Sequence, residues 1–302
     1  MWYAGGVMFG RKKRALPKRV VFIFVDGIGM RERAADNPIN EANCPVLCRL
    51  MRDHAVPLDA TLSVPGLPQS ATGQATIFCG VNVAKAVGRH VSGFPGPKIR
   101  EMIQQNNLFM ELARRGIPCK FANAHYAAIP AKVKTHRFLS VTALMALSVP
   151  ESLDLSEDRH LNHAGVEDII KSAIRDRGYA GPAVDPVFAA NHLFDLSQKH
   201  PFVLFEYFQT DRSGHGKDPR HVTKVLRICD AFMDTLLKRL KRSKTLLVMT
   251  SDHGNLEDTS VATHTANPVP LIAIGPGAKA FCEGMRSLCD ITPRLLETLE
   301  KL

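Results

Sequence analysis

The stretch RVVFIFVDGIGM, from Arg19 to Met30, decides the fold. Its first seven residues are almost all Val, Ile or Phe, a run typical of a strand buried on both faces of a parallel sheet. The run ends at Asp26. Two later stretches repeat the arrangement, FVLFEYFQTDRSGHG from Phe202 to Gly216 and TLLVMTSDHGN from Thr245 to Asn255. Three buried strands that each end in metal-binding residue types predict an open sheet with a polar site at its carboxyl edge.

Amphipathic helical segments alternate with apolar runs along the rest of the chain, and this alternation predicts an α/β fold around a mostly parallel sheet. We expect strands at 19–25, 55–62, 118–124, 202–208, 245–250 and 269–274. We expect helices at 40–54, 71–79, 107–115, 191–200, 219–240 and 292–302.

The pattern divides the chain into a core and two additions. Residues 1–18 form a basic tail, since six of the nine residues from Arg11 to Arg19 are Lys or Arg. Residues 126–189 contain short helical segments and Pro-Gly turns, which predict an inserted cap subdomain. The core is then made of residues 19–125 and 190–302.

The composition limits the classes of partner. The chain has 302 residues and a net charge of +10, which suits anionic partners such as phosphate esters, nucleic acid or a membrane surface. The basic segment from Arg11 to Arg19 has no interleaved aromatic residues to stack on bases, so we expect a small phosphorylated substrate and no nucleic acid. No apolar run reaches the roughly 18 residues of a membrane span, and the basic cluster follows the apolar start, the reverse of a secretory signal. The oligomeric state stays open.

Seven cysteines without a CxxC pair do not form a disulfide framework, so a reducing cytoplasm is expected. Cys44 and Cys48 lie one helical turn apart, too few ligands for a zinc-thiolate site.

Carboxylate and imidazole side chains follow the three buried strands. They are Asp26, Asp211 with His215, and Asp252 with His253, while His264 precedes the next strand. Each strand-end Asp alone is more often a helix cap or a turn former. Together, these residues offer the oxygen and nitrogen ligands that Zn²⁺ or Mn²⁺ accepts, in numbers sufficient for two ions.

A nucleophile is available in LPQSATGQ, from Leu67 to Gln74. Ser70 begins a predicted helix, where the backbone N–H groups and the helix dipole favour both an alkoxide and a bound phosphate. The alternative is that Ser70 or Gln69 only caps this helix.

These motifs resemble the alkaline phosphatase superfamily, within it the branch of cofactor-independent phosphoglycerate mutase and phosphopentomutase. The matching segments are VDGIGM at 25–30, QTDRSGHG at 209–216, TSDHGN at 250–255 and HTANPVP at 264–270. The resemblance implies a three-layer sandwich with two divalent ions, Mn²⁺ or Zn²⁺. It implies that Ser70 becomes a phosphoserine intermediate. One ion would be bound by Asp26, Ser70, Asp252 and His253, and the other by Asp211, His215 and His264.

The sequence also departs from that branch. The mutases place a Gly-His after the nucleophile, where this chain has Gly73 and Gln74, so Thr72 remains a second candidate nucleophile. The predicted cap is smaller than the mutase insertions, and a mutase needs a lid that holds its intermediate. Hydrolysis is therefore favoured over isomerisation. The segment around Cys44 does not match the Cys-x-Pro-x-Arg motif of sulfatases, which disfavours that activity.

Three functions follow, in descending order of preference. The first is a phosphohydrolase of a small phosphate ester, the second a phosphomutase, and the third a non-catalytic anion or nucleic-acid binding protein. Lys85, Arg89 and His90 are candidates for binding a second anionic group of the substrate, although a solvated helix end accounts for them as well. His125, His136 and Arg137 open the predicted cap and could line its underside, with ordinary surface residues as the alternative.

Overall fold

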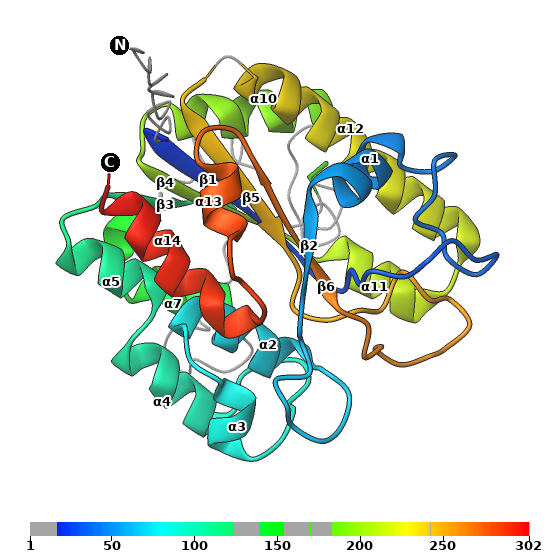
Figure 1. Ribbon diagram of the computed structural model, residues 1–302, viewed down its shortest axis with the longest axis horizontal. Helices are drawn as coiled ribbons and strands as arrows, with labels where there is room; N and C mark the ends of the chain where they lie inside the picture. The colour runs from blue at the N-terminus through cyan, green and yellow to red at the C-terminus, as the bar shows by residue number, and fades with distance from the viewer. Residues whose placement is uncertain (1–16, 124–138, 154–168, 171–182, 242, 302) are drawn as a thin grey trace, which may run out of the picture.

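A six-stranded sheet forms the centre of the computed structural model, which describes residues 17–123, 139–153, 169–170, 183–241 and 243–301 (Figure 1). The strand order is β2-β6-β5-β1-β4-β3. The strands are β1 (Arg19–Val25), β2 (Ala55–Leu58), β3 (Cys119–Phe121), β4 (Phe202–Tyr207), β5 (Thr245–Thr250) and β6 (Val269–Ile274).

Strand direction determines which residues meet at the carboxyl edge. β3, β4, β1 and β5 run parallel, with Val25 opposite Tyr207 and Phe24 opposite Thr250. β6 is antiparallel to β5, and β2 is antiparallel to β6. Because β6 is reversed, its beginning lies at the same edge as the ends of β1, β4 and β5. A residue before β6 and residues after the other three strands therefore share one edge.

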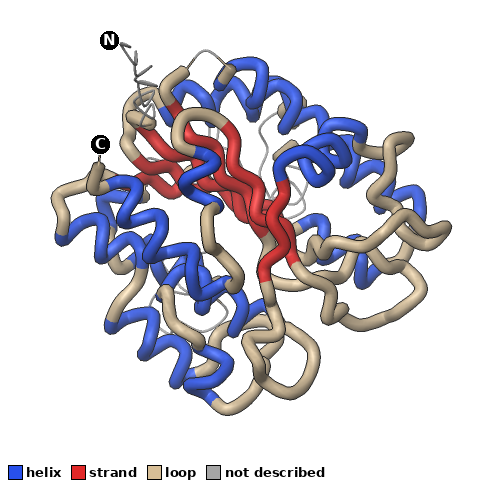
Figure 2. Tube along the Cα trace, in the orientation of Figure 1, coloured by secondary structure: helices blue, strands red, loops and turns tan. Residues whose placement is uncertain are grey.

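Helices cover both faces of the sheet, which gives three layers (Figure 2). The two faces of β1 pack against two different sets of helices. Phe22 and Phe24 belong to a hydrophobic cluster with the first set, and Ile23 belongs to a cluster with the second set. The first set is α2 (Ser70–Cys79), α3 (Val83–Val87), α4 (Pro97–Gln105), α5 (Leu108–Arg114), α7 (Val141–Leu147), α13 (Ala278–Cys282) and α14 (Ile291–Leu299). The second set is α1 (Pro45–His54), α10 (Pro186–Ser197) and α12 (Pro219–Leu240).

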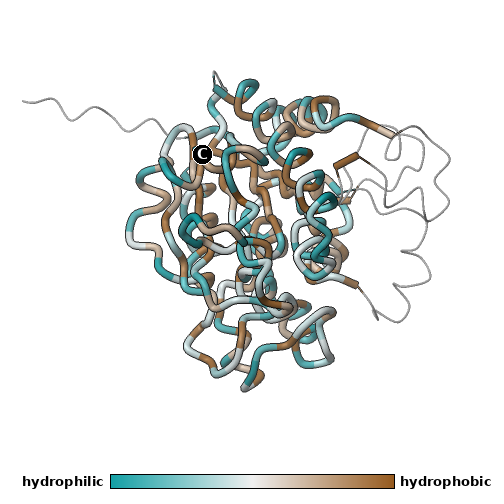
Figure 3. Tube along the Cα trace, turned by 90° about the vertical axis from the view of Figure 1, so that its right-hand side faces the viewer, coloured by the Kyte–Doolittle hydropathy of each residue, from teal (hydrophilic) through white to brown (hydrophobic). Residues whose placement is uncertain are grey.

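Burial follows the expected hydrophobic pattern. Hydrophobic stretches gather in the interior of the molecule, and hydrophilic and hydrophobic residues alternate along the coils at its outside (Figure 3). The residues from Val20 to Val25 are at most 1% exposed, as predicted for a strand covered on both faces. The predicted α/β class and three-layer architecture are thus confirmed.

Several predicted boundaries agree with the structure and others differ. The predictions 19–25, 219–240, 245–250 and 269–274 coincide with β1, α12, β5 and β6. The strand predicted at 55–62 ends at Leu58, and Leu62 and Ser63 have φ values of 55° and 54°, incompatible with an extended strand. Helices α3, α4, α13 and α11 (Gln209–Gly216) were not predicted. The Ser and two Gly residues of α11 are more typical of a turn.

The predicted cap is only partly described. α7 and the short 3₁₀ turn Pro150–Ser152 fall within 126–189, yet Val141 and Leu144 pack in the core cluster of the first face. α10 also begins inside this range, at Pro186. Much of the remaining range, and residues 1–16 of the tail, lie outside the described residues, so the cap and the tail remain predictions.

Two further observations concern the cysteines and the helices. All seven cysteines are free, in agreement with the absence of a disulfide framework. Among the helices that the structure describes, none is both long and apolar enough to cross a membrane.

Candidate metal centre

The predicted ligands converge at the carboxyl edge of the sheet. Asp26 follows β1, and Asp252 and His253 follow β5. Asp211 and His215 lie four residues apart on α11, directly after β4, so both project from the same side of that helix. His264 precedes the reversed strand β6 and joins them from the other direction.

The first group consists of Asp26, Asp252 and His253, whose ligand atoms all lie within 4.8 Å of one another. His253 Nε2 is 3.3 Å from Asp26 Oδ1 and 3.6 Å from Asp252 Oδ2. The Ser70 Oγ lies 2.9 Å from the same nitrogen. The predicted nucleophile therefore reaches the first group directly.

The second group consists of Asp211, His253 and His264, again with ligand atoms within 4.8 Å. His215 adjoins it, with its Nε2 3.0 Å from His264 Nε2 and 3.5 Å from Asp211 Oδ2. The two groups share His253, whose ring stacks on His264 with centroids 3.7 Å apart. The family resemblance assigned His253 to the first group alone, whereas the structure places it in both groups.

Hydrogen bonds hold two of the second group's members in position. The carbonyl oxygen of Pro68 lies 2.9 Å from His264 Nδ1, and a carbonyl can only accept, so Nδ1 carries the proton and Nε2 offers its lone pair to the centre. Asn255 Nδ2 donates to Asp211 Oδ1 over 2.6 Å. His215 is more open, with 45% of its side chain exposed. The centre is therefore most open on the side of His215, whereas the side chains of His253 and His264 are 0% and 5% exposed.

Burial and charge give this cluster an unusual protonation pattern. Burial raises the pKa of Asp26 well above its ordinary value, and the charges of Asp252 and Asp211 add to the effect. Burial together with the charge of Asp211 raises the pKa of Asp252 to about 7. Burial lowers the pKa of His253 to about 4 and also lowers the pKa of His264. The imidazoles of His253 and His264 are thus neutral at pH 7, and Asp26 and Asp252 resist ionisation because their negative charges would repel each other.

This chemistry fits divalent cations. Asp26 Oδ1 and His253 Nδ1 are buried without a hydrogen-bond partner among the described residues. Within the same ranges, no Lys or Arg forms an ion pair with Asp26, Asp211 or Asp252. Buried carboxylates without a basic partner are strongly destabilising unless another cation offsets them. Neutral imidazoles and carboxylates are also the ligands that Zn²⁺ and Mn²⁺ accept.

Close backbone approaches bring these loops together. Gly27 has φ +69°, and a Cβ there would lie 2.8 Å from Asp211 Cβ. A Cβ on Gly73 would lie 2.8 Å from the carbonyl oxygen of Asp252. Both distances are shorter than real Cβ contacts, so only glycine lets α2 and α11 approach the centre this closely.

Ser70 is the first residue of α2, with Gln69 at the N-cap in an extended conformation and without a side-chain cap bond. The hydroxyl of Ser70 is therefore at the positive end of a ten-residue helix. The capping role considered for Gln69 is not seen.

The alternative nucleophile, Thr72, is differently placed. Its buried hydroxyl donates to the carbonyl of Gln69 and accepts from the backbone N–H of Val91. The first bond lies within the start of α2, and the second holds that start against Val91. The geometry favours Ser70.

The candidate substrate-binding residues lie on α3 and in the loop after it. Lys85 and Arg89 are exposed. His90 Nε2 lies 3.1 and 3.2 Å from the carbonyls of Thr61 and Val64, so this nitrogen donates within the loop and is not available to an anion. Contact of these three residues with substrate remains a prediction. His125, His136 and Arg137 lie outside the described residues.

Glu257 is a central residue that the sequence pattern did not predict. It is fully buried, and its Oε2 accepts from the backbone N–H groups of Gly29 and Asn255 over 2.8 and 2.9 Å. Its Oε1 accepts from Thr265 Oγ1 and Asn267 Nδ2 over 2.5 and 3.0 Å. One carboxylate therefore ties together the loops after β1, after β5 and before β6. Its position just after the Asp-His-Gly-Asn motif was the available signal.

We expect Glu257→Gln to lower the free energy of unfolding by about 3 kcal/mol. The four groups around Glu257 are all hydrogen-bond donors, two on each carboxylate oxygen. Whichever way the glutamine amide turned, its nitrogen would face two of these donors, and both would lose their acceptor. Urea unfolding of the purified variant measures the change. Asp258→Asn is the matched control, because Asp258 pairs with the partly exposed Arg31 and its loss should cost under about 1 kcal/mol. Equal effects of the two variants would contradict a central role for Glu257.

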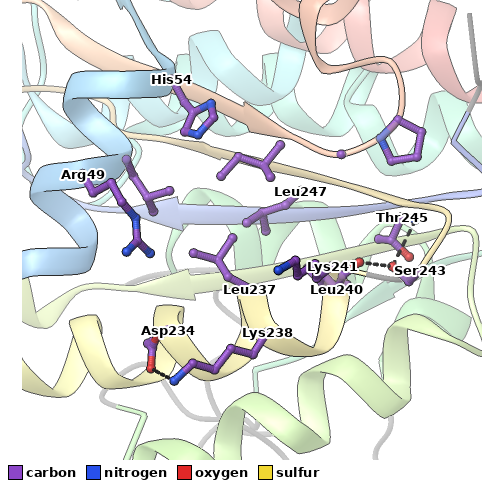
Figure 4. Close-up of a pocket in the computed structure, with 14 residues that line it drawn as sticks. Arg49, His54, Asp234, Leu237, Lys238, Leu240, Lys241, Ser243, Thr245 and Leu247 are labelled. Carbon is purple, nitrogen blue, oxygen red and sulfur yellow. Dashed lines mark hydrogen bonds and ion pairs between the residues drawn. The ribbon is translucent and has the colours of Figure 1, made fainter.

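A cavity of about 560 Å³ lies elsewhere in the molecule (Figure 4). Leu237, Lys241 and Thr245 are among its lining residues. Thr245 begins β5, whereas the metal centre follows the end of that strand, about 20 Å away at the rise of an extended chain. The cavity is separate from the candidate centre.

Solved structures show the same fold. The alkaline phosphatase from the Antarctic bacterium TAB5 superposes with a TM-score of 0.58 at 14% sequence identity, over 95% of this chain and 99% of that one. The phosphoglycerate mutase of Leishmania mexicana superposes with a TM-score of 0.52 at 11% identity, over 94% of this chain and 96% of the other. At these identities the likeness concerns the fold.

Curated relatives match parts of the chain. The 2,3-bisphosphoglycerate-independent phosphoglycerate mutase of Methylobacillus flagellatus is 32% identical over 108 residues, which are 33% of this chain and 21% of that enzyme. The enzyme of the same name from Ehrlichia canis is 25% identical over 200 residues, or 61% of this chain and 39% of the relative. The chain thus spans well under half the length of these relatives.

The sequence profile of the Metalloenzyme superfamily matches residues 18–301, which is nearly the whole chain and includes every member of the candidate centre. Together with the convergence of carboxylates and imidazoles at the carboxyl edge, this match places the chain in a family: it belongs to the Metalloenzyme superfamily.

Proposed function

We propose that this chain is a metal-dependent phosphohydrolase that cleaves a small phosphate ester with Ser70 as the nucleophile. The observation that carries the proposal is the 2.9 Å contact between Ser70 Oγ and His253 Nε2. His253 belongs to both ligand groups, so the hydroxyl lies where the groups meet. Phosphoryl transfer needs a nucleophile at that position.

In this proposal Asp26, Ser70, Asp252 and His253 hold one divalent ion, and Asp211, His215 and His264 hold the other. The mixed carboxylate and imidazole ligands suit Mn²⁺ or Zn²⁺. Bound ions would lower the pKa of the Ser70 hydroxyl and offset the negative charge on the phosphoryl oxygens.

The side chains then have defined parts in the reaction. Ser70 Oγ forms a bond to phosphorus while the bond from phosphorus to the ester oxygen breaks, and the departing alcohol takes up the proton that the hydroxyl loses. The N-terminus of α2 stabilises both the alkoxide and the phosphoryl group. Water then attacks the phosphoserine, which releases inorganic phosphate and restores the hydroxyl.

A phosphomutase is the second candidate, because the curated relatives carry the name phosphoglycerate mutase. In that case the phosphoryl group on Ser70 would return to another hydroxyl of the same molecule. A substrate with a labelled phosphoryl group separates the two activities. A hydrolase moves the label to inorganic phosphate, whereas a mutase keeps it in an isomer of the substrate.

A panel of small phosphate esters, assayed with Mn²⁺ or Zn²⁺ and with a chelator, tests the proposal. We expect turnover of at least one ester that chelation abolishes and added metal restores. A non-catalytic binder of anions would instead show no turnover and steeply salt-dependent binding that ignores chelators. The proposal also includes a cytoplasmic location, in keeping with seven free thiols, and no nucleic-acid partner.

A further inference from the structure

Gln74 lies next to the first ligand group and contacts both of its carboxylates. Its Nε2 is 3.1 Å from Asp26 Oδ2 and 3.2 Å from Asp252 Oδ2. The side chain projects from α2 one helical turn after Ser70 and is 4% exposed. When both acids are ionised, as metal ligands are, their oxygens can only accept; the amide nitrogen then faces both acids, and each of its two hydrogens has one acceptor.

The two acids need such a partner. Both are buried, and within the described ranges neither forms an ion pair with Lys or Arg. A neutral amide offsets part of their repulsion without bringing a charge of its own. A Lys at this position would instead supply a cation and compete with a metal ion for the same two carboxylates.

The bonds also orient the acids. Because Asp26 Oδ2 is held by Gln74, its Oδ1 is turned towards His253 Nε2, 3.3 Å away, and has no hydrogen-bond donor among the described residues. Asp252 is fixed beside it by the second hydrogen of the same nitrogen. The result is a pair of carboxylates and an imidazole that surround one point.

We propose that Gln74 is a positioning residue that holds Asp26 and Asp252 in the arrangement in which they bind one divalent cation together with His253. The inference rests on the proposed function only in that a cation binds this group, and it does not depend on turnover. Partners of metal-binding side chains typically contribute 10–100-fold to metal affinity.

The test is a calorimetric titration of metal-free protein with Mn²⁺, comparing the full chain with Gln74→Met. Methionine keeps a similar volume but donates no hydrogen bond. We expect the dissociation constant of one site to rise about 10–100-fold, while that of the other changes less than about threefold. The same titration in a His215→Ala background, where the second group is impaired, assigns the weakened site to the first group.

Thr76→Val is the matched control, because Thr76 is a buried residue of the same helix that bonds the backbone of Val83 away from the centre. It should reduce stability without changing either dissociation constant. Two outcomes would overturn the inference: unchanged binding in Gln74→Met, or equal weakening of both sites. If the unaltered chain bound no metal, both this inference and the metal-dependent function would fail; binding without turnover would remove only the function.

Discussion

We expect Ser70→Ala to lower the turnover of any phosphate ester that this chain hydrolyses by at least about 10³-fold, because the variant has no group to accept the phosphoryl unit. The neighbouring side chains do not supply a replacement: His253 is committed to the ligand groups, and the Thr72 hydroxyl is held by Gln69 and Val91. Steady-state rates, measured at saturating Mn²⁺ or Zn²⁺, give the effect. Since Ser70 is also a proposed metal ligand, metal content must be measured in the same samples.

Thr72→Val is the control for this experiment. It removes a hydroxyl that bonds within the start of α2 but leaves Ser70 and the ligand groups in place. We expect its turnover to stay within about tenfold of the unaltered chain, since only the local packing of α2 changes. If Thr72→Val abolished turnover and Ser70→Ala retained it, Thr72 would be the nucleophile. Accumulation of labelled phosphate on Ser70 during turnover would provide independent support.

The sequence was sufficient to predict the sheet and the convergence of the ligands. The buried strands that end at Asp26 and Asp252 carry a strong local signal, because a continuous apolar run of six or seven residues bounded by a polar turn is too short for a buried helix and fits a buried strand. The place of His264 at the same edge depended on strand direction. It results from the reversal of β6, which no local pattern encodes.

The contacts that complete the site were beyond the sequence. Gln74 meets Asp252, 178 positions later, and Glu257 meets Gly29, 228 positions earlier. Such pairs arise only when the loops pack; the motif before Glu257 indicates that it lies near the site, but no local pattern shows which distant residue either side chain meets. α11 was missed for a different reason: its Gly and Ser residues have low helix propensity, and tertiary contacts with α12 outweigh that preference. The helix matters because it sets the spacing of Asp211 and His215.

Removal of metal should destabilise the whole fold. Two ions at 100 times their dissociation constants would together raise the free energy of unfolding by about 5 kcal/mol, a melting shift on the order of 10 °C. In the metal-free protein the raised pKa of Asp252, about 7 against 3.8 for the ordinary group, means that the folded state binds more protons than the unfolded state between those values. The contribution of Asp252 to the stability of the metal-free form should therefore fall as pH rises from about 4 to 7, whereas His253, whose pKa is lowered from 6.5 to about 4, contributes the opposite trend over most of that window. Calorimetric melting across that range, with chelator or with Mn²⁺, measures both effects.

Asp252→Asn separates the destabilising effect of the buried charge from the stabilising effect of the bound metal ion. The substitution removes a fully buried carboxylate that faces Asp26, so the metal-free variant should melt at a higher temperature than the metal-free unaltered chain at pH 8. The same change removes a proposed ligand, and Mn²⁺ should then stabilise the variant by clearly less than the unaltered chain. A buried metal ligand is expected to destabilise the metal-free fold and to stabilise the metal-bound fold. If Mn²⁺ stabilised both proteins equally, Asp252 would not bind the ion, and the buried pair of acids would not form a cation site.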